Sequence, residues 1–414
     1  MRARSAVLIL IFVVCYAQQD PPVAVRKAFE AHDASLQWFS VVATRPVDAN
    51  WEVVLAEAAP LESDGVRPPA ANMQGMQLGV FLVSRASHQV KMVIDISHWS
   101  PDAYPELDEV DAHSVRLHST GDYGDYQESV RYFYDSSRPR PTVTIRYRTA
   151  SLQSARHENG KLIYTAEYGF GGEQFGIKPQ RATITINTEG TRGAAPTFVI
   201  ADDHTPMSQA TKTARYQATK TARFQAAGQT FVVEAESQPS GIRLAGVPGK
   251  EQFFPAPVTH IGPPAFDGRR IWFARRFLDG DGYSGAGAIG AFDSVSHQYK
   301  IYNLPEIGTA SGTAILADGN QIWVGLEGRE EDSGHSAGLL RYNRLTGTVR
   351  KYNVNDVIHT INRANATIYC GTSDGLYTIQ GDLVRHYRFE PDATGKLTMV
   401  ARPAPFHPIA ESQK

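Results

Sequence analysis

A motif that recurs three times in the last third of the chain restricts the fold more than any other feature. "DGRRIWFARRF" at 267–277 returns as "DGNQIWVGLEG" at 318–328 and, more loosely, as "ANATIYCGTSD" at 364–374. Trp272, Trp323 and Tyr369 hold one position in the motif, spaced by 51 and then 46 residues. A unit that recurs at this spacing is typical of repeat architectures.

Each copy of the motif continues as a small sheet. A Gly-led strand follows ("GAIGAFD", "GLLRYN", "GLYTI"), and then a further strand ("QYKIYNL", "TVRKYNV", "LVRHYRF"). Asp-Gly supplies the positive φ that a tight turn needs. Because a four-stranded unit of this kind cannot bury both of its faces alone, the copies must pack side by side around an axis.

Weaker hairpins with the same order lie upstream, at 79–96, 129–147, 181–200 and 230–254. Together they give about seven units, roughly 40–55 residues apart, which is the usual length of a propeller blade. The sequence therefore predicts an all-β protein, a β-propeller of seven four-stranded antiparallel blades, with six or eight as alternatives. We expect one domain over 18–400, with its clearest blades at 260–391, and a C-terminal tail at 401–414. One helix candidate lies at 23–39, and a strand near 37–44 is expected to close the ring by pairing with the last blade.

The first 17 residues, "MRARSAVLILIFVVCYA", read as a cleaved signal peptide and predict a secreted or periplasmic protein. Arg2 and Arg4 precede a short apolar core, which is too short to span a bilayer, and no second apolar run predicts a transmembrane segment. Lipidation at Cys15 is the alternative. After cleavage only Cys370 remains, which excludes an internal disulfide.

The charge balance argues against a nucleic-acid partner. The chain has 41 basic and 43 acidic residues, whereas nucleic-acid-binding domains usually carry a basic excess. One basic stretch, "QATKTARYQATKTARFQA" at 209–226, repeats an octet that begins at Thr211 and at Thr219. Because eight is even, both copies of the octet present the same faces in an extended chain, with alanines and aromatics on one side. We therefore expect an extra strand or extended loop just before "TFVVEA", and a helix is the minority interpretation.

The repeats at 322–353 and 368–387 resemble two propeller families. "QIWVG…AGLLRYNRLTGTVRKYN" and "TIYCGTSDGLYTI" are similar to repeats of the periplasmic sensor propellers of two-component regulators. They are also similar to repeats of the seven-bladed streptogramin lyases. The resemblance implies a propeller blade rather than a reaction, because the Pro-His-Gly-type turn of the lyases is not intact in this sequence.

Two sets of connections are expected at the mouth of the central channel. Those between blades include His260 and His359, about ten to twelve residues before the repeated aromatic, and imidazoles there could hold a metal or act as a base. Those within blades are two long loops at 275–288 and 326–338. The predicted ligand-binding residues are His260, Arg275, Arg329, His335 and His359. Asp279 and Asp281, in "DGDG", are candidate ligands for a divalent cation, Ca²⁺ or Mg²⁺, although no cofactor is required.

These observations predict a secreted or periplasmic propeller that binds a small molecule or a protein at its mouth, as a binding or scaffolding module. Many blade signals and no complete catalytic motif favour this hypothesis. The alternative is a hydrolase or lyase with a site at the mouth of the channel, with or without a metal ion. His260, His359 and acidic loop residues would then hold the metal.

Overall fold

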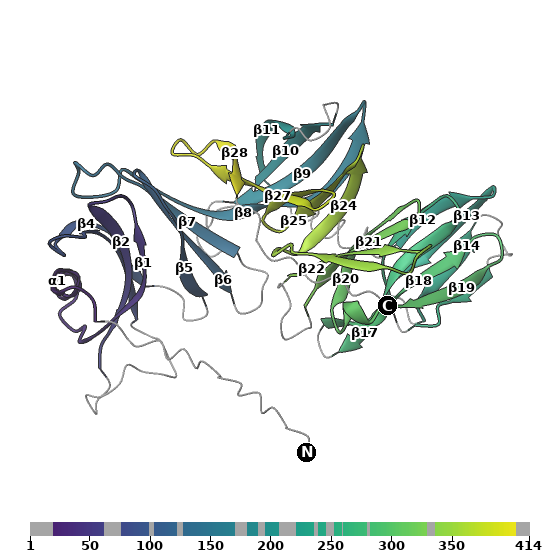
Figure 1. Ribbon diagram of the computed structural model, residues 1–414, viewed down its shortest axis with the longest axis horizontal. Coiled ribbons are helices and arrows are strands. Elements are labelled where there is room, and N and C mark those ends of the chain that lie inside the picture. Colours follow the sequence, from purple (N-terminus) through teal and green to yellow (C-terminus); the bar gives the residue numbers. More distant parts are fainter. Residues whose placement is uncertain are drawn as a thin grey trace, which may run out of the picture. The chain divides into compact units, whose positions relative to one another are not determined.

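The computed structural model describes residues 20–61, 76–98, 103–121, 127–169, 180–188, 195–206, 221–235, 239–245, 252–258, 260–279, 282–328 and 336–402. Nearly all regular structure in these ranges is β-strand (Figure 1). Contacts divide the chain into two compact units, Met1–Leu117 with Tyr132–Thr144, and His118–Arg131 with Ile145–Lys414. The single domain expected over 18–400 stays a prediction.

Strands outnumber helices in both units. The elements of the first unit are α1 (Val23–His32), β1 (Trp38–Pro46), β2 (Trp51–Ala59), β3 (Gln77–Ser84), β4 (Val90–His98) and β5 (Ala103–Val110). Three strands contain residues of both units, namely β6 (Ser114–Gly121), β7 (Gln127–Phe133) and β8 (Val143–Glu158). The elements of the second unit are β9 (Lys161–Gly169), β10 (Gln180–Asn187), β11 (Thr197–Pro206), β12 (Thr221–Ala226), β13 (Gln229–Glu234), β14 (Gly241–Ala245), β15 (Gln252–Pro255), β16 (His260–Phe266), β17 (Arg270–Asp279), β18 (Gly282–Asp293), β19 (Gln298–Asn303), η2 (Pro305–Ile307), β20 (Ser311–Asp318), β21 (Gln321–Glu327), β22 (Ser336–Asn343), β23 (Val349–Tyr352), β24 (Ile358–Ala364), β25 (Thr367–Thr372), β26 (Gly375–Gln380), β27 (Leu383–Pro391) and β28 (Leu397–Arg402).

Consecutive strands pair into antiparallel sheets, and across the described ranges these make seven four-stranded blades. We number them in chain order: blade 1 (β1–β4), blade 2 (β5–β8), blade 3 (β8–β11), blade 4 (β12–β15), blade 5 (β16–β19), blade 6 (β20–β23) and blade 7 (β24–β27). Blades 2 and 3 share the long strand β8, and β28 adds a fifth strand to blade 7. The predicted all-β class and the seven blades are confirmed.

The repeated aromatic residues occupy equivalent places, as the sequence predicted. Trp272, Trp323 and Tyr369 lie on the second strands of blades 5, 6 and 7, and they are 0 %, 6 % and 6 % exposed. Trp272 packs in the core between blades 5 and 6, and Trp323 in the core between blades 6 and 7. Each aromatic therefore seals its own blade against a neighbour.

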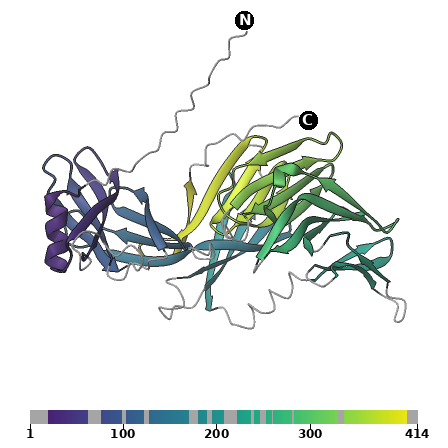
Figure 2. The ribbon, with the colours of Figure 1, turned by 90° about the horizontal axis from the view of Figure 1, so that it is seen from below.

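The order in which the blades of the second unit pack does not follow the chain throughout. Blade 4 packs on blade 5 through a core that includes Phe231 and Phe273, and blades 5, 6 and 7 follow in order (Figure 2). Blade 7 then packs on blade 3, where the Tyr164 hydroxyl donates to the Tyr369 carbonyl at 3.3 Å. The expected strand near 37–44 exists as β1, but it pairs with β2 in blade 1, and the outermost strand of blade 7 is β28. The ring closure predicted from the sequence is therefore wrong.

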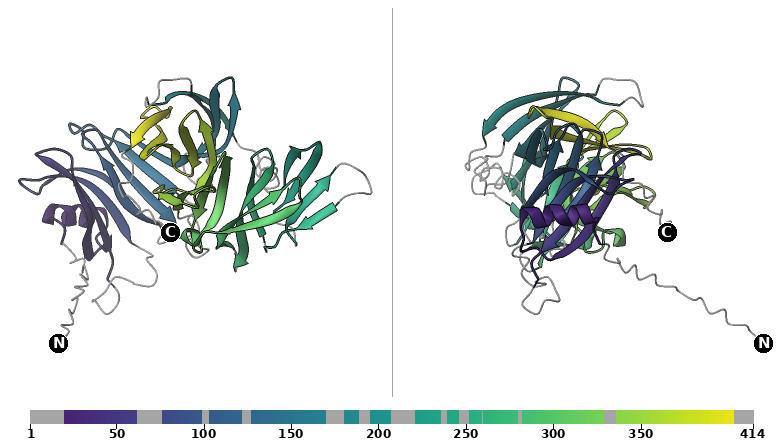
Figure 3. Two further views of the ribbon diagram at one scale, coloured as in Figure 1. Left: turned by 45° about the vertical axis from the view of Figure 1, so that its right-hand side comes forward. Right: turned by 90° about the vertical axis from the view of Figure 1, so that its left-hand side faces the viewer.

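In the first unit, α1 covers one face of blade 1 (Figure 3). The helix buries Val25 and Phe29, and the Phe29 ring meets the Phe81 ring at 5.1 Å. Gly79 lies beneath them, where an added Cβ would come within 2.6 Å of both rings, so only glycine allows this close approach. The helix predicted at 23–39 is confirmed over its first ten residues and ends at His32.

The second copy of the octet forms a strand. β12 (Thr221–Ala226) lies directly before β13 and is an edge strand of blade 4. Ala222, Phe224 and Ala226 are at least partly buried against the core between blades 4 and 5, whereas Arg223 and Gln225 are exposed. The predicted extended conformation and its two faces are confirmed here, and residues 209–220 lie outside the described residues.

None of the helices in the described residues is long and apolar enough to cross a membrane. The signal peptide expected at 1–17, with Cys15, lies outside those residues and stays a prediction. Cys370 is buried on β25, as expected for a small apolar side chain.

The turn between β18 and β19 depends on a carboxylate. Asp293 accepts hydrogen bonds from the amides of Val295 and Ser296 at 3.0 Å and from Arg269 at 2.7 Å. Burial alone would raise the pKa of Asp293, but these hydrogen bonds outweigh it and lower the pKa to about 2. In blade 6 the same turn uses Asn343, which accepts from two amides in the same way.

We expect Asp293→Asn to weaken the fold in a pH-dependent manner. Asn can keep the two amide hydrogen bonds through its side-chain oxygen, as Asn343 does, but its amide nitrogen cannot accept from Arg269, so the charge and the Arg269 hydrogen bond are lost. A carboxylate with a depressed pKa stabilises the folded state above its unfolded pKa of about 3.9, and this contribution disappears as the pH falls toward about 2. Urea denaturation at pH 7 should therefore favour the wild type, and the difference should vanish near pH 2. A difference that stays constant over this range would contradict the assignment.

Candidate functional site

The structure places two predicted site residues on neighbouring strands of blade 5. His260 begins β16 and is buried, with its Nδ1 3.5 Å from the Ser240 hydroxyl. In the β16–β17 pairing, His260 lies opposite Arg276 and Ile261 lies opposite Arg275, which is half-buried. His260 and Arg275 therefore belong to the same end of blade 5.

His359 does not occupy the place in blade 7 that His260 occupies in blade 5. In blades 5 and 6, the residue twelve positions before the aromatic is His260 and Ser311, and both begin the first strand. In blade 7 this position belongs to Val357, whose carbonyl accepts from the Ser373 amide. His359 lies two residues further on, in the β-bulge of β24. The equivalence of the two histidines, inferred from a looser spacing, is corrected by this register.

The other predicted residues lie partly beyond what the structure describes. Arg329, His335 and Asp281 are outside the described residues. Asp279 ends β17, where its backbone pairs with Gly282, and its side chain is not among the described ones. The convergence of His260, Arg275, Arg329, His335 and His359 therefore stays a prediction, as does a cation at Asp279 and Asp281.

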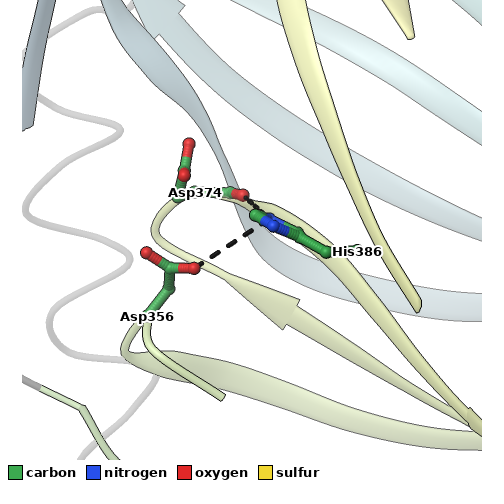
Figure 4. A group of neighbouring side chains, drawn as sticks. All are labelled: Asp356, Asp374 and His386. Atoms are coloured by element: carbon green, nitrogen blue, oxygen red, sulfur yellow. Dashed lines mark hydrogen bonds and ion pairs between the residues drawn. The ribbon is translucent and has the colours of Figure 1, made fainter. Parts of the chain in front are cut away.

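A different group of ionisable residues comes together in blade 7 (Figure 4). Asp356 precedes β24, Asp374 lies in the turn between β25 and β26, and His386 lies on β27. All three are buried, and one potential ligand atom of each lies within 4.8 Å of the others. Asp356 belongs to the connection at 355–362 between blades 6 and 7, and Asp374 lies in the short turn between the second and third strands of blade 7.

The polar contacts within this group, which we call the blade 7 cluster, are short and directed. His386 Nε2 donates to the Asp374 carbonyl at 2.7 Å and lies 3.9 Å from Asp356 Oδ2. The Tyr377 hydroxyl donates to Asp356 Oδ2 at 2.7 Å, and its ring stacks on the His386 ring at 4.1 Å. The Asp374 carboxylate forms an ion pair with Arg388. Burial, and then the negative charge of Asp356, raise the pKa of the Tyr377 hydroxyl.

Strand alternation explains why the cluster continues along β27. His386, Arg388 and Glu390 are spaced by two residues, so they share one face of the strand. Glu390 is 1 % exposed and pairs with Arg131 at 3.0 Å and Arg402 at 2.8 Å. The Tyr147 hydroxyl also donates to Glu390, at 3.2 Å. One face of β27 therefore carries a buried row of opposite charges.

Two carboxylates and an imidazole are ligand types that a zinc or manganese ion could use. Here, however, the His386 Nε2 proton points at a carbonyl, Tyr377 already donates to Asp356, and Arg388 neutralises Asp374. The same burial keeps a substrate away from His386. The geometry therefore fits a structural hydrogen-bond network that joins strand ends of blade 7 better than an acid–base centre.

The sequence pointed to one segment of this cluster, the connection at 355–362, but to none of its three residues. The connection at 355–362 was assigned to the mouth, yet His359 drew attention because it is a histidine, whereas Asp356 is the residue that turns inward. His386 lies on the last strand of its blade, outside both sets of loops. The signal that could have found it is the alternation of His386, Arg388 and Glu390 along one strand.

A surface groove lies between blades 5 and 6, and we call it the 5–6 groove. Its volume is about 270 Å³, and its lining residues are Tyr302, Asn303, Leu304, Glu306, Tyr342, Gly347 and Val349. The Tyr302 ring lies 5.8 Å from the Tyr342 ring and 5.4 Å from the buried Trp272 ring. Lys300 Nζ lies over Tyr302 at 4.9 Å. The groove thus combines aromatic surface with charges of both signs.

Successive four-stranded antiparallel blades with a shared sealing aromatic define the class of this protein as a β-propeller type. No protein-family model matches the sequence, and no curated protein matches it.

Solved structures resemble the chain weakly. One is the β-propeller domain of the Trilobed protease from Pyrococcus furiosus, with 9% identity, a TM-score of 0.26, and coverage of 85% of this chain and 93% of that one. Another is the extracellular domain of the candidate one-component system BT4673 from B. thetaiotaomicron, with 10% identity and a TM-score of 0.28. The match covers 83% of this chain and 64% of that one. A third is the acylaminoacyl peptidase of Pyrococcus horikoshii, with 11% identity and a TM-score of 0.28. The match covers 86% of this chain and 58% of that one. The chain spans less than two thirds of the last two proteins. TM-scores below 0.5 assign no ligand and no reaction, so the function is argued from this chain's own side chains.

Proposed function

We propose that this protein is a binding module that holds an extended segment of a partner protein along the outer edge of blade 5, with a side chain in the 5–6 groove. The observation that carries the proposal is the groove itself, a cavity of about 270 Å³ between two tyrosine rings. Tyrosine offers a rigid apolar surface with a polar tip, which suits recognition of another chain.

The edge beside the groove supports a peptide as the ligand. β19 is the last strand of blade 5, and it contributes Tyr302 to the groove. In blade 7 the equivalent strand, β27, pairs antiparallel with β28, from His386 opposite Arg402 to Pro391 opposite Leu397. The outer edge of a blade in this chain thus accepts one more strand. A partner strand on β19 would direct every second side chain toward the face that carries Tyr302.

We expect Tyr302→Ala to weaken peptide binding at least tenfold, because aromatic anchors dominate such interfaces. The measurement is selection of a random hexapeptide library on the full chain, followed by dissociation constants of the enriched peptides. Gln298→Ala, on the same strand but outside the groove, is the matched control and should bind as the wild type does. Equal affinity of the wild type and Tyr302→Ala, or the absence of enriched peptides, would contradict the proposal.

A metal-assisted hydrolase or lyase is the second candidate, and the blade 7 cluster is the observation that favours it. Its groups already have partners in Tyr377 and Arg388, which favours the binding module. We expect no change in melting temperature when Zn²⁺, Mg²⁺ or Ca²⁺ is added to the full chain. A rise that saturates with the concentration of one ion would reverse the ranking, because a ligand that binds only the folded state stabilises it by mass action.

Export of the chain remains part of the proposal. Its support is the sequence of residues 1–17, with a charged start and a short apolar core. Cleavage after Ala17 would release the protein to the periplasm or the exterior, whereas lipidation would retain it at Cys15. Ligand binding at the mouth, through the five residues predicted there, is proposed as a further site. A nucleic-acid partner is not proposed, because the charges balance.

A further inference from the structure

The last strands of the four-stranded sheets in blades 5, 6 and 7 share a basic residue two positions before a tyrosine. In chain order, these pairs are Lys300 and Tyr302, Arg350 and Tyr352, and Arg385 and Tyr387. Residues two positions apart share one face of a strand. In blades 5 and 6 the basic group lies over the tyrosine ring, at 4.9 Å and 5.1 Å from its centre. The pair is therefore one feature of the repeat.

Between blades 6 and 7, the basic residue of this pair meets a carboxylate. Arg350 forms an ion pair with Asp382, in the turn between β26 and β27. Asp382 lies two residues before Val384, and Gly347 lies two residues before Val349. Val384 and Val349 occupy equivalent places in the β26–β27 and β22–β23 pairings. The equivalent of Asp382 in blade 6 is therefore a glycine.

The structure leaves room for an acidic group at Gly347. This residue lines the 5–6 groove, and a Cβ added to it would meet no heavy atom within 4 Å apart from its chain neighbours. Lys300, the equivalent of Arg350, is exposed on β19. Within the described part of the chain, Lys300 contacts the Tyr302 ring and forms no ion pair. The boundary between blades 5 and 6 therefore keeps the basic partner of the ion pair and has a glycine in place of the acidic one.

We propose that the bound peptide supplies this carboxylate: an aspartate or glutamate pairs with Lys300, two residues after the apolar residue held in the 5–6 groove. The inference rests on the binding function proposed above. The order of the two residues follows from the antiparallel addition seen in blade 7, where the apolar Ala401 of β28 lies opposite Tyr387, the equivalent of Tyr302. In such a pair, the partner residue opposite Lys300 follows the one opposite Tyr302 by two positions, and both point to the same face. Opposite charges across two strands on one face attract each other, so the partner's motif is apolar-x-acidic.

The acidic group that lines the groove does not cancel this preference. Burial lowers the pKa of Lys351, and the negative charge of Glu306 partly opposes that change, so Glu306 has a cation of its own nearby. Lys351 lies on β23, whereas Lys300 lies on β19. Counted over the described side chains at the groove, two lysines and one glutamate leave a net positive charge, which favours an anionic ligand.

The test compares four full-length proteins, the wild type, Lys300→Gln, Gly347→Asp and Gly347→Asn, on peptides enriched in the hexapeptide selection. Each peptide is synthesised with an amidated C-terminus, beside a copy in which its acidic residue is replaced by the corresponding amide. We expect the acidic peptide to bind the wild type about two- to fivefold more tightly than its amide copy, the size of one exposed ion pair. Lys300→Gln should bind both peptides alike.

The two substitutions at Gly347 separate charge from occupied space. Gly347→Asp should also lose the preference, since its own carboxylate would pair with Lys300 as Asp382 pairs with Arg350. Gly347→Asn should keep the preference, because asparagine fills the same space without a charge. The φ of 74° at Gly347 is one that aspartate and asparagine adopt more readily than most residues, so both variants should fold.

The possible failures are distinguishable. Enriched peptides without the apolar-x-acidic motif, or equal binding of the acidic and amide peptides by the wild type, would overturn this inference and leave the binding module standing. A preference that persists in Lys300→Gln or in Gly347→Asp would overturn it as well. The absence of any enriched peptide would instead contradict the binding function, and this inference with it.

Discussion

Glu390→Ala is expected to lower the free energy of unfolding by about 3–5 kcal/mol, because removing one partner of a buried ion pair leaves the other charge uncompensated. Arg131 and Arg402 are 13 % and 10 % exposed, and both would lose the carboxylate they contact. The Tyr147 hydroxyl would lose an acceptor as well. Urea denaturation followed by far-UV circular dichroism measures the loss.

The exposed pair between Arg156 and Glu158 supplies a matched control for this prediction. Its side chains are 62 % and 55 % exposed, so Glu158→Ala should cost at most about 1 kcal/mol. Glu390→Gln should lie between the two, because it removes the charge but keeps an oxygen acceptor. If Glu390→Ala and Glu158→Ala lose similar amounts, the buried row on β27 does not stabilise the second unit in the way its geometry implies.

The expected size of the effect follows from what Glu390 connects. Arg131 lies on β7, Tyr147 lies on β8, and Arg402 is the last residue of β28. Tyr147 and Glu390 are 243 residues apart in the sequence. These contacts therefore add to the apolar core between blades 3 and 7, where Tyr164 and Tyr369 meet. Losing the carboxylate therefore removes the contacts that join β27 to β7 and β8, which are distant from it in the sequence.

The sequence predicted the local structure of blades 5–7 well, because that structure depends on short-range chemistry. Alternation of apolar residues sets the strands, and aspartates such as Asp267 and Asp293 accept the amides of the turns that join them. Trp272 and Trp323 hold one position in the motif, and both are buried. Each of these features is decided within a few residues along the chain.

The packing of blade 7 on blade 3 could not be predicted in this way. It depends on side chains that lie more than 200 residues apart, such as Tyr164 and Tyr369, and no periodicity relates the two segments. Chain order suggested instead that the N-terminal strand would complete the last blade. β28 occupies the edge of blade 7 instead. It follows β27 after a short turn at Asp392, so the entropic cost of closing the loop between the two strands is small.

The spacing of His359 shows where inference from the repeat went wrong by two residues. The first strands of blades 5, 6 and 7 each contain a register irregularity, and the residues twelve positions before the aromatic are His260, Ser311 and Val357. Because the spacing before the aromatic was taken as ten to twelve residues, His359 was selected in place of Val357. A two-residue shift would keep the side chain on the same face of a regular strand, but His359 lies in the β-bulge of β24, where the alternation is interrupted.

Trp272→Ala is expected to cost about 3–5 kcal/mol, the range for a large aromatic removed from a core that cannot fully collapse. Trp272 is 0 % exposed and packs between blades 5 and 6. Its indole N–H donates to Asp267 Oδ2 at 2.9 Å. Because Arg344 also contacts this oxygen, at 3.2 Å, the substitution does not strand the carboxylate, and the loss reports mainly on packing.

Trp272→Phe separates the contribution of apolar packing from that of the hydrogen bond to Asp267, because phenylalanine keeps most of the apolar contact and lacks the indole N–H. It should lose about 1–2 kcal/mol, near the value of one hydrogen bond plus a small cavity. Circular dichroism is the appropriate probe, since the substitution removes a fluorophore. The same alanine substitution at Trp323 should also be costly, because Trp323 seals blade 6 against blade 7 as Trp272 seals blade 5 against blade 6. A cost below about 1 kcal/mol at both positions would mean that the repeated aromatics do not hold neighbouring blades together, and the physical basis of the repeat would fail.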